Sequence, residues 1–240
     1  MRIKEIYEKL DELSPFNLQE RWDNSGLLVG DMEREIEHIA LGLDLDKETL
    51  ESAKENTLFL VHHPLIFSGL KELDFSVYPT NLLEIMVKKN LSLIAMHTNF
   101  DKTHLNAYVF EKVLGFTKEF QNDFICKVTG DWSKNELLSL LKNKLGVEVL
   151  KVVSPKNRIT SIALTTGAGA SLMDEVDADC FLTGDIKYHD AMKAMSQNLM
   201  MVDIGHYESE QFFVDVLKSE LENLGILGII SQSQNPFVIS

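Results

Sequence analysis

The sequence predicts an α/β protein with largely parallel or mixed sheets. Short apolar runs alternate with amphipathic stretches of helical period from one end of the 240-residue chain to the other. Several of the apolar runs end at histidines, and open α/β sheets bind ligands at the carboxyl ends of their strands. The sequence contains no strict repeat and no low-complexity segment that would indicate another architecture. The alternation of expected strands and helices therefore decides the fold class.

Eight stretches carry apolar residues at helical spacing and are expected to be helices. Ser14-Pro15 ends the first helix, Gly115 ends the fourth, and Ser133 is a plausible N-cap for the fifth. The expected helices span residues 2–13, 47–56, 80–90, 104–114, 133–145, 173–176, 191–196 and 207–224.

The apolar runs between these helices are expected to be strands. Residues 58–61 show the signal most clearly, because the run is too short for a helix and Pro64 favours extended geometry for the residue before it. A short strand is expected after the turn-forming sequence Asp23-Asn24-Ser25-Gly26, which by itself predicts a tight turn. The other expected strands span residues 38–45, 91–96, 124–128, 147–153, 159–164, 180–183, 199–204 and 226–231.

The composition limits the function classes. The formal net charge of −14 argues against nucleic acid as the main partner, since phosphate backbones require a basic surface. A small anionic substrate held by a metal ion stays compatible with this charge. No apolar run approaches the length of a membrane span and the N-terminus lacks a signal-peptide core, so we expect a cytoplasmic protein with no membrane partner.

The cysteine pattern argues against a thiolate site. Cys126 and Cys180 are 54 positions apart and form no CxxC motif, so neither a disulfide framework nor a thiolate zinc site is expected.

Metal-capable side chains recur at the ends of the expected strands. His62 and His63 follow the strand 58–61, and His97 follows the strand 91–96, with Asp101 four residues later. Histidine nitrogen suits zinc, iron, manganese, cobalt or nickel, and carboxylates can bridge two cations. Taken alone, His97 would be a histidine that orients a metal ligand or makes its hydrogen bonds within the fold. The hypothesis of a metal site therefore depends on several such residues occurring together at strand ends.

A second set of such residues lies later in the chain. Asp185 and His189 follow the strand 180–183, and His206 and Glu210 follow the strand 199–204. The i, i+4 spacing of His206 and Glu210 puts an imidazole and a carboxylate on one face of a helical turn. Three histidines with two carboxylates suit a dinuclear centre better than a closed structural zinc site.

One glycine-containing loop is a weaker candidate. Thr166-Gly167-Ala168-Gly169-Ala170-Ser171 lies between an expected strand and a helix, where backbone amides can receive an anion. It is neither a Walker loop nor a complete dinucleotide fingerprint.

Taken together, these motifs resemble those of the NIF3-like family, also known as DUF34 or YbgI-type proteins and as GTP cyclohydrolase I type 2 homologs. The resemblance rests on six spaced motifs in the order of the family. They are Trp22-Asp23-Asn24-Ser25-Gly26-Leu27, His62-His63-Pro64-Leu65-Ile66-Phe67, His97-Thr98-Asn99-Phe100-Asp101, Thr166-Gly167-Ala168-Gly169, Gly184-Asp185-Ile186-Lys187-Tyr188-His189 and Gly205-His206-Tyr207-Glu208-Ser209-Glu210.

The resemblance implies two interleaved α/β lobes with mixed sheets, the NIF3-like fold. Residues 1–100 and 206–240 would form the first, discontinuous lobe, and residues 101–205 the second. No inserted middle domain is expected at this length. The family assembles as a toroid of six chains, so a homohexamer is expected.

The resemblance also implies a site with two divalent metal ions per chain. The ligands of the family fall here on His62, His63, Asp101, His206 and Glu210, with the two carboxylates as bridges. The motif with Asp185 and His189 would line the same cavity.

The activity implied is that of a metal-dependent hydrolase of the GTP cyclohydrolase type. A metal-bridging hydroxide would attack C8 of the guanine ring, and ring opening would release formate. His97, Asp185 and His189 are the candidate catalytic residues, the two histidines as proton shuttles. The substrate would be a small molecule, with a nucleotide as one candidate. A two-metal phosphoesterase and a non-catalytic metal-binding or interaction protein remain open alternatives.

Overall fold

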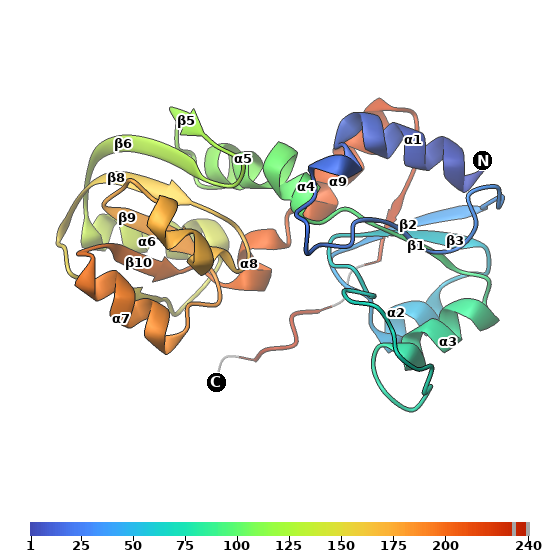
Figure 1. Cartoon of the computed structure of the whole chain (residues 1–240). Helices are drawn as coiled ribbons and strands as arrows, with labels where there is room; N and C mark the ends of the chain where they lie inside the picture. Colours follow the sequence, from blue (N-terminus) through green and yellow to red (C-terminus); the bar gives the residue numbers. More distant parts are fainter. Residues whose placement is uncertain (232–233, 239–240) are drawn as a thin grey trace. The chain divides into compact units, whose positions relative to one another are not determined.

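The computed structural model describes residues 1–231 and 234–238. Its strands form two mixed sheets, each with helices packed on it, which confirms the predicted fold class (Figure 1). The chain divides into two compact units, Met1–Phe100 with Phe213–Ser240 as unit 1, and Asp101–Phe212 as unit 2.

The helices of the described residues are mostly short. The α-helices are α1 Ile3–Leu13, α2 Lys47–Ser52, α3 Thr80–Lys88, α4 Thr98–Phe100, α5 Asn106–Tyr108, α6 Lys134–Leu145, α7 Tyr188–Ser196, α8 His206–Glu210 and α9 Phe213–Asn223. The 3-10 segments are η1 Phe16–Leu18 and η4 Gly169–Glu175, and the π-helical segments are η2 Asp101–Leu105 and η3 Val109–Val113.

The strands follow the predicted alternation. They are β1 Gly26–Val29, β2 His38–Gly42, β3 Thr57–Val61, β4 Ser92–Ala95, β5 Phe120–Gln121, β6 Cys126–Ser133, β7 Lys151–Val153, β8 Arg158–Leu164, β9 Cys180–Thr183, β10 Met200–Asp203 and β11 Ile229–Ile230. No helix within residues 1–231 and 234–238 combines the length and the apolar character that crossing a bilayer demands.

Unit 1 is a five-stranded sheet of order β1-β4-β3-β2-β11, in which all neighbours are parallel except β1 and β4. Helices α2 and α3 cover one face, and α1 and α9 cover the other (Figure 1). Every residue of β3 and β4 is buried, as continuous apolar runs in a sheet covered on both faces require.

Unit 2 is a six-stranded sheet of order β5-β6-β8-β9-β10-β7. Strands β8, β9 and β10 are parallel, and the remaining neighbours are antiparallel. Helix α6 buries the stripe Leu137, Leu141 and Leu145, and it begins at the predicted N-cap, where Ser133 and Glu136 form a capping box.

Two expectations about this organisation are corrected. The stretch 207–224 forms two helices, α8 and α9, instead of one. The second boundary between the units follows Phe212, whereas the sequence placed it after residue 205, because α8 makes its contacts within unit 2. Residues 232–233 and 239–240 of the expected first lobe lie outside the described residues.

Candidate metal centre

Three histidines meet at one edge of the unit 1 sheet. His62 and His63 directly follow β3, and His97 comes two residues after β4. These strands are parallel neighbours with Val61 opposite Ala95, so their carboxyl ends coincide. One ring nitrogen from each histidine lies within 4.8 Å of the others, which makes the three a group that could hold a metal ion.

The first two of these rings are oriented by hydrogen bonds at Nδ1. Nδ1 of the buried His62 donates to the backbone carbonyl of Met96 at 2.9 Å. Nδ1 of His63 donates to Oδ1 of Asp44 at 2.8 Å. Because the acceptors fix the proton on Nδ1, the lone pair of each ring lies on Nε2.

The third ring is held by a carboxylate. Nδ1 of His97 donates to Oδ1 of Asp23 at 2.8 Å, and the other oxygen of this buried carboxylate accepts from the Thr98 backbone amide at 3.1 Å. Burial by itself raises the pKa of Asp23. The hydrogen bond and charge of His97, with the bonds from Thr98 and Asn24, outweigh burial and hold that pKa well below its usual range.

Unit 2 carries a histidine and two buried carboxylates. His206 opens α8 just after β10, and its Nε2 lies 2.9 Å from Oε2 of Glu210, one turn later. Nδ1 of His206 is 2.8 Å from Oδ2 of Asp185. Asp101, at the start of η2, places a carboxylate oxygen within 4.8 Å of one from Glu210.

Gly167 makes room for this group. Its φ of +62° is a left-handed conformation, and a Cβ built there would overlap Oε1 of Glu210 and lie 3.6 Å from Nε2 of His206. The backbone amide of Gly167 donates to Ser209, which holds the loop against α8. A side chain at this position would fill the space beside the two donor atoms.

The residues of both groups fit a divalent metal. All four histidines have Nδ1 bound to an oxygen acceptor, which is the usual arrangement of metal-ligating histidine. Nε2 of His206 and Oε2 of Glu210 form an ion pair at 2.9 Å, so two potential donor atoms lie side by side. Two buried carboxylates as close as Asp101 and Glu210 are also unfavourable without a compensating positive charge.

The remaining predicted residues lie in different settings. Asp185 contacts the ring of His206, so the structure gives it the position of an orienting group. His189 is an exposed residue of α7 whose ring lies 5.4 Å from the ring of Tyr188.

The loop considered for anion binding has another role. The amides of Thr166, Gly167 and Gly169 donate to the side chains of Asn106, Ser209 and Thr183, respectively. These bonds use the donors that an anion would need, so the anion-loop hypothesis is wrong for these amides. The loop instead packs beside Glu210.

Sequence reasoning missed two orienting carboxylates. The turn-forming sequence at Asp23 by itself predicts only a tight turn. The turn bond from Ser25 is present, but the same carboxylate also binds His97. Asp44 carried no signal, since it lies 19 residues before His63 and follows a strand without any motif. The polar turn beginning at Asp23 was the available clue, because it precedes a strand that pairs with β4.

The fold and these groups define an α/β protein with groups of histidine, aspartate and glutamate that could hold a metal ion. The chain belongs to the Duf34/NIF3 (NGG1p interacting factor 3) family, whose model matches residues 1–236. This confirms the resemblance that the six motifs indicate.

Named relatives and a solved structure agree with this assignment. The chain is 47% identical over 238 residues to the GTP cyclohydrolase 1 type 2 homolog of Campylobacter jejuni, covering 99% of each chain. It is 41% identical over 239 residues to the GTP cyclohydrolase 1 type 2 of Helicobacter pylori strain J99, covering 99% of this chain and 98% of that one. The crystal structure of Staphylococcus aureus hypothetical protein SA1388 has a TM-score of 0.84 at 25% identity, over 100% of this chain and 99% of that one.

Proposed function

We propose that the protein binds two divalent metal ions and is a metal-dependent hydrolase that acts on a nucleotide, with GTP as the first substrate to test. The observation that supports the metal part is the shared state of His62, His63 and His206, whose Nδ1 atoms are all bound to oxygen acceptors. The names of the relatives in Campylobacter jejuni and Helicobacter pylori support the choice of GTP.

In this proposal five side chains hold the metals, with the two carboxylates as bridges: His62, His63, Asp101, His206 and Glu210. Both carboxylates lie close in sequence to buried aromatic residues of unit 1. Asp101 directly follows Phe100, and Glu210 precedes Phe213 by three residues. The rings of Phe100 and Phe213 are 5.0 Å apart, and the ring of Phe213 is 4.9 Å from the ring of His62.

A bound pair of divalent cations would supply Lewis acidity and would lower the pKa of water beside it. The protein would position that chemistry through Asp44 and Asp185, which hold the rings of His63 and His206. Ring opening of GTP at C8 consumes water and releases the C8 carbon as formate. It also requires a group that moves protons near neutral pH.

We assign the proton transfer to His97. Asp23 holds its Nδ1, so Nε2 is the nitrogen that accepts a proton and returns it. The ring of His97 lies 5.1 Å from the ring of His62, beside the proposed ligands. His189 is the second candidate for this role.

Elemental analysis across added divalent metals, paired with formate release from GTP, tests the proposal. We expect about two metals per chain, with formate released, as a two-metal centre implies. Asp101→Ala and Glu210→Ala should each empty both metal positions because each removes a bridge, and His62→Ala should mainly weaken one. Asp215→Asn, which changes an exposed acid of α9, is the matched control and should keep the metal content of the parent.

Other outcomes would replace parts of the proposal. Full metal content in both carboxylate variants would refute the dinuclear assignment. Asp185→Asn should lower turnover and keep the bound metal at saturating concentration, with an affinity about ten-fold weaker because Asp185 orients the ring of His206. Complete loss of metal there would make Asp185 a ligand. Two metals without turnover of GTP would favour the two-metal phosphoesterase, for which the buried carboxylates within 4.8 Å of each other are the supporting observation.

Metal that affects only stability, with no turnover of either substrate class, would favour a non-catalytic metal-binding protein. The assembly of six chains remains a prediction, and the mass of the particle in solution tests it.

A further inference from the structure

Two aromatic rings stand exposed beside the histidines of unit 1. Trp22 is 58% exposed and Phe67 is 51% exposed, and their ring centroids are 5.9 Å apart. Each ring also lies 6.2 Å from the ring of His97, at interplanar angles of 76° and 74°. The three rings thus lie close together, and two of them are more than half exposed. We call them the aromatic platform (Trp22, Phe67 and His97).

Hydrogen bonds of neighbouring residues hold the aromatic platform in place. Nδ2 of Asn24, two residues after Trp22, donates to the carbonyl of Ile66, the residue before Phe67, at 2.5 Å. The carboxylate of Asp23 holds His97 at 2.8 Å. Residues next to both exposed rings are therefore held by hydrogen bonds. Rings on an ordered backbone lose less conformational entropy when a ligand binds than rings on a mobile segment would.

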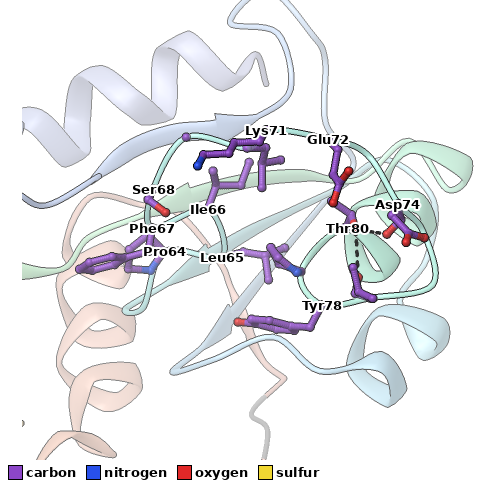
Figure 2. A pocket seen from close by; sticks show the side chains of 14 residues that line it. Pro64, Leu65, Ile66, Phe67, Ser68, Lys71, Glu72, Asp74, Tyr78 and Thr80 are labelled. Carbon is purple, nitrogen blue, oxygen red and sulfur yellow. Dashed lines mark hydrogen bonds between the residues drawn. The ribbon is translucent and has the colours of Figure 1, made fainter.

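A hollow of about 400 Å³ adjoins the platform, and Phe67 belongs to its lining. Figure 2 shows Phe67 at one end of the lining, with Asp74 and Thr80 at the other. The volume falls within the range of small-molecule sites. The described residues of the lining include one lysine, Lys71, against two acids, Glu72 and Asp74, so the hollow does not attract phosphate.

We propose that Trp22 and Phe67 form the subsite for a planar heteroaromatic ring of the substrate, which stacks on the exposed face of Trp22. The inference rests on the proposed function and specifies its substrate class, because the platform includes His97, the proposed proton carrier. Aromatic faces bind any planar heterocycle, and the acidic lining favours the uncharged base and sugar over the phosphates. The phosphates of a nucleotide would then lie outside this hollow.

Tryptophan fluorescence tests the subsite without any need for turnover. The chain has two tryptophans, and Trp132 packs against Phe116 in unit 2, so Trp132→Phe leaves Trp22 as the only tryptophan. Guanosine is the probe, with ribose and inorganic triphosphate as ligands that lack the ring. We expect guanosine to quench the emission of Trp22 and the two ring-free ligands to leave it unchanged.

Substitutions then locate the binding energy by calorimetry with guanosine. Trp22→Ala and Phe67→Ala should each lower the affinity for guanosine by about ten-fold. Trp22→Phe should keep most of that affinity because phenylalanine still offers a stacking face. Phe120→Ala is the matched control, since Phe120 is 54% exposed and belongs to β5 of unit 2. It should bind guanosine as the parent does.

Three results would overturn the subsite. The first is that guanosine does not quench the emission of Trp22. The second is that Trp22→Ala and the parent bind guanosine with equal affinity. The third is that Trp22→Ala changes the particle mass but not the affinity for guanosine, which would make the platform a contact between copies. Elemental analysis of the same variants separates this inference from the proposed function. Loss of guanosine binding at full metal content supports the subsite, whereas absence of metal from the parent refutes the proposed function and leaves the stacking result to stand by itself.

Discussion

Gly167→Ala tests whether the space beside Glu210 is needed for metal binding. The substitution adds one methyl group at a position where a Cβ would overlap Oε1 of Glu210. It also forces an L-residue into the left-handed region, at a φ of +62°. Both effects are destabilising, but only the first concerns the metal centre.

The two effects have separable magnitudes. A left-handed backbone costs an alanine about 1–2 kcal/mol. The overlap adds about 1–3 kcal/mol, the usual cost of overpacking, since Glu210 is 3% exposed and has little room to move. The free energy of unfolding should therefore fall by about 2–5 kcal/mol in Gly167→Ala.

Gly146→Ala is the matched control. Gly146 ends α6 with a φ of +69°, and a Cβ built there would meet no atom within 4 Å. It therefore carries the backbone cost without the overlap. Urea unfolding of both variants gives the overlap as the difference, about 1–3 kcal/mol.

The metal content of the same variants connects stability to the site. If Glu210 is a ligand, its displacement should lower metal affinity by about ten-fold to a hundred-fold in Gly167→Ala and leave Gly146→Ala unchanged. Adding Gly167→Ala to a Glu210→Ala background should then cost only the backbone term, because the overlapping oxygen is gone. Equal stability of the two glycine variants, together with parental metal affinity in both, would refute the reasoning.

Three further predictions concern single contacts. Asp44→Asn removes the charge that holds the ring of His63 and should lower metal affinity by about ten-fold, measured by calorimetry. Asp179 pairs with Lys156 and accepts hydrogen bonds from Thr160, and these contacts hold the pKa of Asp179 at about 2, below the unfolded value of 3.8. Its contribution of about 2 kcal/mol is therefore present above pH 3.8 and is lost as pH falls towards 2, so Asp179→Asn should lower unfolding free energy at pH 7 but not at pH 2. Ser133→Ala removes the N-cap of α6 and should cost about 1 kcal/mol in urea unfolding.

The prediction for Asp179 has a matched control, and those for Asp179 and Asp44 each have a contrary result. Asp177→Asn breaks the ion pair between Lys127 and Asp177, whose carboxylate is fully exposed, and should leave stability nearly unchanged at both pH values. A pH-independent effect of Asp179→Asn would show that its role is packing. Parental metal affinity in Asp44→Asn would show that orienting His63 is unnecessary.

The sequence predicts the fold well where a local pattern decides it. The strands that end at His62 and at His97 appear where the apolar runs indicate them, because a short buried run bounded by polar residues has few alternatives. The N-cap at Ser133 follows the same local chemistry.

Local patterns do not predict where a helix ends if the amphipathic period continues past that point. The buried residues Ser209, Phe213, Val216 and Leu217 keep a helical spacing, yet α8 ends at Glu210 and α9 begins at Phe213. Neither proline nor glycine marks this break, so no residue type reveals it. The boundary between the two units falls there, which is a property of tertiary packing.

The chemical state of the histidines depends on contacts that no local motif contains. The carboxylates that hold His97, His206 and His63 precede them by 74, 21 and 19 residues, respectively. Only folding of each unit brings them together. The contacts that folding forms place an oxygen acceptor at Nδ1 of each ring, which leaves the lone pair on Nε2. In the proposed metal centre, rings that are already oriented would bind an ion more tightly, because binding would not have to order them. The orienting carboxylates, although distant in sequence, therefore belong to the proposed site as much as the proposed ligands do.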